Sequence, residues 1–462
     1  MAESTANTFI KESAQKAFDT KHRDIINYNI DKYSMAFEKG KSKFADLENS
    51  KIKANLIKWK VMENLDRYLL QFEANFTARG GKVIWANDAT EALDEIYSII
   101  ARKKAKSVVK SKSMATEEIE LNHFLASKNI EAIETDLGEY IIQLLDQKPY
   151  HFVTPAMHLS LEDIAKLFHE KFDTPLDASA EQLTMKAREL LRDRYLSAEI
   201  GITGANFLIA ETGSIAITEN EGNARLTSTF PKTHIAVVGI EKIIPNVQDL
   251  EVFWPLLSTH GTGQNLTVYN TLLTGPKQPY ESDGPEEMYV ILLDNGRSKL
   301  LAQKEQRQGL YCIRCGACLN VCPIYQNIGG HTYETTYQGP IGSLISPHLN
   351  GMKEFKHLSY ASTLCGKCTE VCPVGIDIQR MLLVNRKDSV DQGLATKTEQ
   401  KVWQWFTYGI MRRKLIDFFG GKLKNFFLKK FFQKTWGDQR ELPKLADKSF
   451  SKQWKEHQKN KE

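Results

Sequence analysis

All seven cysteines of this 462-residue chain lie between Cys312 and Cys372. The first four form the motif CIRCGACLNVCP at residues 312–323, in which the cysteine spacing is C-x2-C-x2-C-x3-C-P. Bacterial ferredoxins bind iron–sulfur clusters through cysteine thiolates at this spacing. Gly316 suits a backbone that must pass close to inorganic sulfide, because glycine has no Cβ. The motif therefore predicts iron–sulfur chemistry, which is the transfer of single electrons.

A second motif, CGKCTEVCP at residues 365–373, has the spacing C-x2-C-x3-C-P. A structural zinc site needs four ligands and usually pairs two C-x2-C units. Seven cysteines with two C-x3-C-P endings fit two interleaved clusters better than they fit zinc. The odd number of cysteines and their short spacings also argue against a disulfide framework.

In ferredoxins with two clusters, the last cysteine of each motif binds the cluster of the other motif. The same cross-ligation predicts a first [4Fe–4S] cluster on Cys312, Cys315, Cys318 and Cys372. It predicts a second [4Fe–4S] cluster on Cys322, Cys365 and Cys368. The second set is one cysteine short, because Ser362 stands where a ferredoxin has its remaining ligand. Three alternatives stay open here: an oxygen ligand from Ser362, an iron open to water or a partner, or a [3Fe–4S] cluster.

The elements that must position these cysteines follow from the pattern of apolar residues. Residues 1–65 have apolar positions at helical spacing and predict an N-terminal helical arm. From about residue 80, KVIWAN, KSVVKSKS and IEAIETD predict strands. Between them, DATEALDEIYSIIARKK, opened by an Asp cap, and TEEIELNHFLASKN predict helices. This alternation predicts βαβ units and a parallel sheet.

The stretch from Asn206 to Ile244 is rich in β-branched residues and has turn signals at Thr212-Gly213 and at Glu221-Gly222-Asn223. It therefore predicts strands joined by tight turns. A linker rich in Pro, Gly and acidic residues follows at about 274–287, and MYVILLDN predicts one more strand. The basic, polar stretch after it indicates a domain boundary near residue 300.

Three segments of the cysteine region, CIRCGACLNVCPIY, IGGHTYETTYQGPIG and LCGKCTEVCPVGIDI, resemble the lactate utilisation iron–sulfur protein B family. Upstream, GITGANFLIAETGSIAITENEGNARLTSTFPKTHIAVVGIEKIIP resembles the lactate-utilisation domain of that family, and the tail is similar to its C-terminal segment. The resemblance covers roughly residues 65–462. The family itself has three cysteines in its second motif, so Ser362 is not a departure from it.

The resemblance implies an α/β domain similar to the sugar-phosphate isomerase and CoA-transferase fold, followed by an α-helical two-cluster ferredoxin domain. We expect four parts: the helical arm at 1–65, the lactate-utilisation α/β domain at 66–300, the ferredoxin domain at 301–385 and a basic aromatic segment at 386–462. The resemblance also implies a role beside two other proteins in oxidising L-lactate to pyruvate, with this chain relaying electrons.

Other residues could do chemistry, and each also has a structural interpretation. Glu211 could be a nucleophilic carboxylate by analogy with CoA transferases, but a strand-end acid beside a turn is the preferred interpretation. Asn206, Thr212 and Gly213 could together line a small anion pocket. Two histidines flank the cluster region and could tune a cluster or be ordinary loop residues: His331 and His348.

The basic character of the chain is local, because its formal net charge is +4 but residues 391–462 carry 17 Lys/Arg against 8 Asp/Glu. Helical spacing puts five residues of this tail near one face, most of them apolar: Phe419, Leu423, Phe427, Lys430 and Phe431. Three lysines flank this face: Lys422, Lys429 and Lys434. Three roles stay open, namely packing on the chain's own ferredoxin domain, docking on a partner subunit, and peripheral contact with an anionic membrane. Nucleic-acid binding is disfavoured, because the aromatics pair up instead of interleaving singly along a basic groove.

No apolar run approaches the roughly 20 residues that cross a bilayer, and the start, MAESTANTFIKESAQKAF, lacks the apolar core of a signal peptide. We therefore expect a cytoplasmic protein without a transmembrane segment. The sequence has no Rossmann glycine fingerprint and no Walker loop that would indicate a nucleotide cofactor. The preferred function is the electron-transfer subunit of an L-lactate-oxidising complex. The alternatives are an α/β domain that itself oxidises a small organic acid, and a redox-sensing adaptor.

Overall fold

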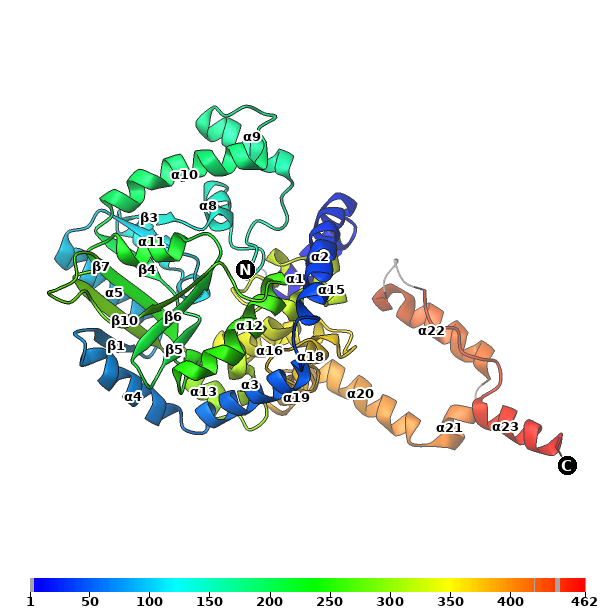
Figure 1. Cartoon of the computed structure of the whole chain (residues 1–462). Coiled ribbons are helices and arrows are strands. Elements are labelled where there is room, and N and C mark those ends of the chain that lie inside the picture. Colours follow the sequence, from blue (N-terminus) through cyan, green and yellow to red (C-terminus); the bar gives the residue numbers. More distant parts are fainter. Residues whose placement is uncertain (1–3, 419, 437–440, 462) are drawn as a thin grey trace. The chain divides into compact units, whose positions relative to one another are not determined.

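Six strands form a sheet in the order β1-β10-β7-β4-β2-β3 (Figure 1). Every neighbouring pair in this sheet is parallel, which confirms the predicted parallel α/β architecture. The computed structural model describes residues 4–418, 420–436 and 441–461. The strands of the parallel sheet are β1 (Lys82–Ala86), β2 (Ser107–Lys110), β3 (Glu131–Glu134), β4 (Ile200–Thr203), β7 (Thr233–Gly239) and β10 (Glu287–Leu293).

The central strands β7 and β10 are apolar on both faces, because both faces of the sheet are covered. Successive residues of β7 point to opposite sides. Ile235 and Val237 pack with residues of α5 (Ala89–Lys103) and α7 (Leu121–Ser127). Ala236 and Val238 belong to a second core, which continues into the cysteine region. The sheet therefore ties the cysteines to the α/β domain.

A smaller sheet has the strand order β8-β5-β6-β9. Its strands are β5 (Phe207–Ile209), β6 (Ser214–Glu219), β8 (Ile243–Ile244) and β9 (Tyr269–Leu273). The turn signal at Thr212-Gly213 joins antiparallel β5 and β6, as predicted. The second predicted turn is wrong, because Gly222, at φ +78°, begins helix α11 (Asn223–Thr229). The Glu219 carboxylate accepts hydrogen bonds from backbone N–H groups at the start of this helix, which stabilises it there.

One helix beside the sheet begins where the sequence predicts, and one predicted helix is divided into two. Asp88 caps α5, since its carboxylate accepts the Glu91 N–H at 3.0 Å. The single helix predicted after β2 is two helices, α6 (Met114–Glu118) and α7, because Glu120 has a positive φ of 53° between them. The remaining helices of this part are α8 (Leu137–Leu144), α9 (Leu161–Phe172), α10 (Ala180–Ser197), η1 (Ile240–Lys242), η2 (Val247–Asp249), α12 (Leu250–Thr262) and α13 (Arg297–Leu301).

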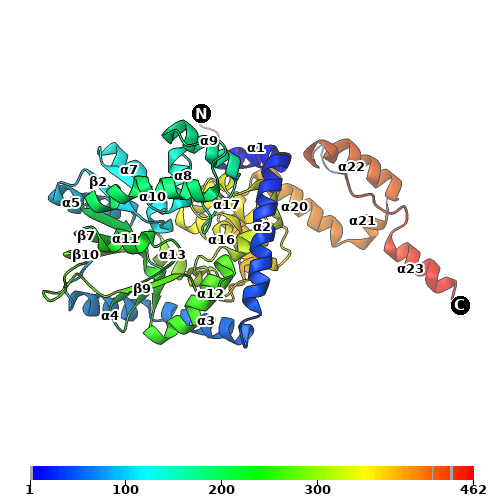
Figure 2. The same cartoon turned by 45° about the horizontal axis from the view of Figure 1, so that its top comes forward.

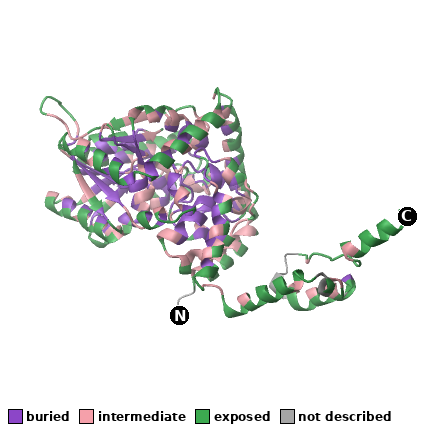
Figure 3. Ribbon diagram, turned by 90° about the horizontal axis from the view of Figure 1, so that it is seen from below, coloured by how far each residue is buried: buried purple, intermediate pink, exposed green. Residues whose placement is uncertain are grey.

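The cysteine region consists of short helices and tight loops, with no strand among its described residues. The helices are η3 (Gln306–Tyr311), α14 (Ala317–Asn320), α15 (Pro323–Ile328), η4 (His331–Tyr333), α16 (Gly339–Leu349), α17 (Met352–Tyr360), α18 (Lys367–Glu370) and α19 (Ile378–Asp391). In Figure 3 the buried residues gather at the sheet and in this region.

The N-terminal arm is helical and packs on both the α/β part and the cysteine region. Figures 1 and 2 show α2 passing close to α12 and the cysteine region. The Tyr33 hydroxyl donates to the His260 carbonyl at 2.6 Å, and the Asn55 amide donates to the Val374 carbonyl at 2.7 Å. Residues 1–388 therefore form one compact unit. The arm helices, and the one that follows them, are α1 (Thr5–Ala17), α2 (Thr20–Lys41), α3 (Leu47–Met62) and α4 (Leu65–Thr77).

Residues 389–462 form a second unit of helices. Aromatic side chains are widely exposed in it, for example Trp405 at 74%. Phe427 and Phe431 stack with ring centroids 5.9 Å apart, so these two residues share one helix face as predicted. Phe419 and the Lys434 side chain, also predicted for this face, lie outside the described residues. Helices of this unit are α20 (Lys397–Ile410), α21 (Arg413–Phe418), α22 (Gly421–Trp436) and α23 (Phe450–Lys459).

None of the helices in the described ranges combines the length and the apolar character that a bilayer crossing requires.

Candidate metal centres and the adjoining cavity

The first cysteine motif is a tight loop between η3 and α14. Arg314 and Gly316, on either side of Cys315, both have positive φ, at 64° and 79°. A Cβ on Gly316 would lie 2.9 Å from the His151 ring, so both the conformation and the close packing require glycine. The Arg314 N–H donates to the Cys312 sulfur at 3.4 Å. Backbone N–H groups of this loop therefore point at the sulfur ligands.

Four cysteines from the two motifs line one small apolar cavity: Cys312, Cys315, Cys318 and Cys372. No cysteine of the chain is in a disulfide. Burial raises the pKa of the Cys372 thiol to about 12. Burial also raises the pKa of Cys315, to which the neighbouring Cys312 adds. Thiols in such surroundings become thiolates when they bind a metal. Four cysteines around one apolar cavity fit a [4Fe–4S] cluster, and the ligand set itself stays a prediction.

The other three cysteines influence one another in the same way. Burial raises the pKa of Cys368 to about 11, and Cys322 adds to this. Burial also raises the pKa of Cys322, with a contribution from Cys365. Cys365 itself is exposed, and hydrogen bonds from the Lys367 N–H and the Thr363 side chain lower its pKa. The fourth cysteine of the first motif therefore interacts with two cysteines of the second motif, and the ligand set of the second cluster stays a prediction.

The second motif repeats the local geometry of the first. Leu364 and Gly366 flank Cys365 with φ of 54° and 85°, and a short helix, α18, begins directly afterwards. The Leu364 N–H donates to the Ser362 hydroxyl at 3.1 Å, just as the Arg314 N–H donates to the sulfur of Cys312. Ser362 therefore takes the structural place of Cys312 in the second motif.

The spacing of the sulfur atoms distinguishes a cluster from a single zinc ion. Tetrahedral zinc with Zn–S bonds of about 2.3 Å brings its sulfurs to about 3.8 Å from one another. Among the described residues, no three cysteine sulfurs lie within 4.8 Å of each other; the group that does is made of carboxylates, Glu117, Glu134 and Glu139. The wider separation of the sulfurs fits a cluster of several irons.

Most of the other residues singled out from the sequence have structural partners. The Glu211 carboxylate accepts the Val247 N–H at 3.1 Å and so caps η2. The His331 and His348 rings pair with the Lys148 carbonyl and the Asn385 side chain. Of the three residues predicted for an anion pocket, Asn206 lines a cavity beside the first motif, whereas Thr212 and Gly213 do not.

This cavity, of about 400 Å³, opens at the carboxyl ends of β2 and β4. After β2 the chain continues to β3 on one side, and after β4 it continues to β7 on the other. The crevice between such strands is the usual ligand site of an open parallel sheet. Residues directly after β2 and β4 line it, among them Lys112 and Asn206. Ile313, Arg314 and Cys315 of the first motif form another wall, so the cavity adjoins the first candidate cluster.

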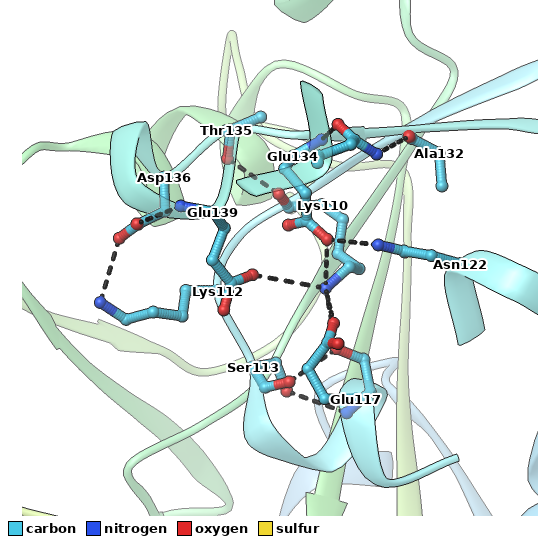
Figure 4. A network of polar contacts seen from close by, with 12 residues as sticks. Lys110, Lys112, Ser113, Glu117, Asn122, Ala132, Glu134, Thr135, Asp136 and Glu139 are labelled. Carbon is cyan, nitrogen blue, oxygen red and sulfur yellow. Dashed lines mark hydrogen bonds and ion pairs between the residues drawn. The ribbon is translucent and has the colours of Figure 1, made fainter. Parts of the chain in front are cut away.

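An ion network stabilises the wall formed by β2 and β3 (Figure 4). The buried Lys110 ammonium lies 2.7 Å from Glu134, 3.1 Å from Glu117 and 3.8 Å from Glu139. Burial and the neighbouring Glu134 raise the pKa of Glu139. Because Lys110 fills the space between the carboxylates, we interpret this group as structural rather than as a metal site. Lys112, which faces the cavity, is also paired, with Asp136 at 3.1 Å.

A cluster of basic residues lies where the cavity meets the first motif. Arg297 pairs with Glu118 at 2.7 Å and with Glu241 at 2.6 Å, and Arg314 lies 3.4 Å from Glu241. Burial alone would raise the pKa of Glu241, but the two arginines hold it at about 2. Lys58, on α3 of the arm, donates to the Glu241 carbonyl and is 1% exposed.

The sequence did not point to Lys58, Lys242, Arg297 or His151. Lys58 and Glu241 are 183 positions apart, and no local pattern joins them. A signal did exist for Glu241 and Lys242, because charged residues directly after a buried parallel strand lie at the ligand-binding edge of the sheet. His151 is held neutral, since burial lowers its pKa to about 3, and it packs on Gly316.

Two family models match the chain, the LUD domain over residues 69–293 and the 4Fe-4S dicluster domain over residues 308–376. Lactate utilization protein B of Bacillus subtilis (strain 168) is 48% identical over 355 residues, which cover 76% of this chain and 74% of that protein. Lactate utilization protein B of Geobacillus sp. (strain WCH70) is 44% identical over 416 residues, or 87% of each chain. An uncharacterized electron transport protein of Escherichia coli (strain K12), YkgF, is 44% identical over 410 residues, or 86% of each chain.

Proposed function

Because the chain belongs to the lactate utilization protein B family, we propose that it relays electrons within an L-lactate-oxidising complex. The family and its iron–sulfur domain support a general role in lactate utilisation and electron transfer. The specific proposal is that this chain is one subunit of several and that it receives electrons derived from L-lactate. The arrangement of the seven cysteines is the observation that supports it most directly.

The two sets of cysteines differ in their access to solvent. Cys315 and Cys318 of the first set are buried and adjoin the α/β domain. In the second set Cys365 is exposed, whereas Cys322 and Cys368 are about as buried as Cys318. Clusters bound at such sites exchange one electron each. A first set beside a cavity and a second set with one solvent-exposed ligand therefore suit a relay from the α/β side to a partner.

Lactate oxidation releases two electrons, which a chain that handles single electrons has to receive from a group able to divide the pair. We propose that this group belongs to a partner subunit. Seven cysteines without a disulfide suit a reducing compartment, and we therefore propose that the protein works in the cytoplasm.

Anaerobic reconstitution tests the proposal. The full-length protein, purified with its clusters, is mixed with L-lactate alone and then with L-lactate and the proteins that co-purify with it. We expect bleaching of the visible iron–sulfur absorption only in the second mixture. A Cys315→Ala variant should still bind the partners but should not pass electrons on.

The partner proteins without this chain are the control. Turnover of L-lactate by this chain in isolation would contradict the relay role and favour an oxidising α/β domain. Normal growth on L-lactate of a strain without this protein and without another lactate dehydrogenase would contradict the role in lactate use.

A further inference from the structure

The cavity beside the first cysteine motif is lined by several parts of the chain. Its floor is the carboxyl edge of the parallel sheet, one wall comes from α12, and another comes from Ile313, Arg314 and Cys315. At about 400 Å³ it falls in the size range of sites for small organic ligands. Its apolar lining, which includes Phe152, Val238 and Leu257, is also typical of such sites.

The end of the cavity nearest the cysteines has an excess of positive charge. Four cations interact there with only two carboxylates: Lys58, Lys242, Arg297 and Arg314 with Glu118 and Glu241. Buried charges in proteins are normally paired. The Cys312 sulfur also interacts with Lys58, Lys242 and Arg314. An anion at this position would supply a further negative partner.

Two of these cations have unused hydrogen-bond donors. The Lys242 ammonium lines the cavity and, within the described residues, makes no hydrogen bond and no ion pair. Burial, together with repulsion from Arg314, lowers the pKa of Lys242 to about 8, so the two cations are close to each other. The Arg314 Nη1 group is buried and has no hydrogen-bond partner. Lys112 differs, because Asp136 and the Val153 carbonyl already satisfy it.

Polar groups for a second contact lie in the same cavity. The Asn206 side chain accepts the Thr218 N–H through its oxygen, and its amide nitrogen donates to no other described residue. This leaves a donor free to bind a hydroxyl or carbonyl oxygen of a ligand.

We propose that this cavity binds a small 2-hydroxy or 2-oxo acid, with the carboxylate between Lys242 and Arg314 and the neighbouring oxygen at Asn206. The proposal deepens the proposed function and rests on it for the identity of the acid. Lys242 and Arg314 are the groups that recognise the carboxylate, and a bound acid would lie next to the loop that carries Cys315.

Calorimetry of the anaerobic, cluster-loaded full-length protein tests the site with L-lactate, pyruvate and inorganic phosphate as separate probes. We expect one site for L-lactate or pyruvate and none for phosphate. Lys242→Gln should weaken binding by about ten- to a hundredfold, since one charge-assisted hydrogen bond is lost. Lys242→Arg should restore most of the affinity. Lys299→Gln, at an exposed lysine of α13 outside the cavity, is the matched control and should bind like the wild type.

A spectroscopic readout connects the site to the cysteines. The acid should change the electron paramagnetic resonance spectrum of the reduced wild-type protein and should leave that of Lys242→Gln unchanged at the same concentration. Binding of phosphate without binding of either acid would overturn the proposal. So would a Lys242→Gln variant with normal binding and a shifted cluster potential, because the charge would then serve the cluster.

These outcomes are distinct from failure of the proposed function. If the acids bind and change the spectrum but the partner proteins never reduce this chain, the relay role fails and the site stands. If electrons pass from the partners and neither acid binds, the site fails and the relay role stands.

Discussion

Ser362 and Cys312 occupy equivalent positions in two copies of one backbone geometry. In each copy a residue with positive φ comes two positions later, and its N–H donates to the side chain in question. The serine hydroxyl thus receives the contact that a sulfur ligand receives in the first motif. This equivalence favours Ser362, rather than a more distant residue, as the group nearest to the remaining iron of the second set.

Ser362→Cys should complete the second set of ligands. We expect the iron content to rise to about eight per chain and the loss of clusters in air to slow, because a fourth thiolate holds the cluster more firmly. Iron analysis after timed exposure to air measures this. Ala361→Cys adds a cysteine one position away and should bring no such gain; equal protection by both variants would contradict the assigned position.

Cys318 and Cys322 belong to one motif but are predicted to bind different clusters. Cys318 lines the first cavity, whereas Cys322 interacts with Cys365 and Cys368. Cys318→Ser should therefore alter the electron paramagnetic resonance signal of one cluster, and Cys322→Ser should alter that of the other. Loss of the same signal in both variants, with the other signal intact, would rule out interleaved ligation.

At the scale of elements, the central strands place charged residues at one edge of the sheet and keep their own interiors free of charge. His234 on β7 is a polar exception, fully buried, with its Nε2 atom 2.8 Å from the Thr203 hydroxyl oxygen of β4. Burial lowers the pKa of His234 to about 3. In the unfolded chain the pKa of histidine is about 6.5, so below that pH the unfolded state binds a proton that the native state does not.

Native stability should therefore fall as the pH drops below about 6.5. The share due to His234 is about 1.4 kcal/mol for each pH unit. The His234→Gln variant lacks the pH dependence of stability that comes from His234. Its unfolding temperature should therefore change less between pH 6.5 and 5.5 than that of the wild type. Thermal unfolding of both proteins at the two pH values compares the slopes. Parallel slopes would mean that His234 takes up its proton in the native state.

The elements that the sequence predicts well are those whose signals are local. Asp88 caps α5 within its own turn, and runs of apolar residues define β7 and β10. The turn predicted at Glu221-Gly222-Asn223 is wrong because Gly222 also suits a helix start, and the Glu219 carboxylate decides between the two. Cysteine spacing predicts the candidate metal centres, whereas Lys58 reaches Glu241 only through the tertiary fold. Most residues at the basic end of the cavity therefore could not be predicted from local sequence patterns.

At the scale of the molecule, the arm, the α/β part and the cysteine region share one core. Ile26 of α2, Leu256 of α12 and Cys318 all belong to it. Residues 389–462 form a separate unit, whose many exposed aromatic residues include Trp405 and Phe427. We therefore expect the two ends of the chain to contribute differently to cluster assembly.

A chain that ends at Ala395 should assemble both clusters and bind its partner proteins more weakly, with a salt dependence where Lys and Arg contribute. Deletion of α1 and α2 is the contrasting change and should reduce the iron content, because it exposes the core around the cysteines. Iron and sulfide analysis with co-purification at two salt concentrations measures both effects. Lost clusters together with unchanged partner binding in the shortened chain would instead support packing of the tail on the ferredoxin region.

The contact between the arm and the cysteine region also constrains when the iron enters. Asn55 of α3 bonds to the carbonyl of Val374, 319 positions later, so the ribosome completes the arm long before its docking site exists. Until the last cysteine has emerged, the loops that will hold the metal are open to the cell's iron and sulfide donors. We expect docking of α3 to restrict access to the buried first set. The order of synthesis therefore favours insertion of the first cluster before the arm docks.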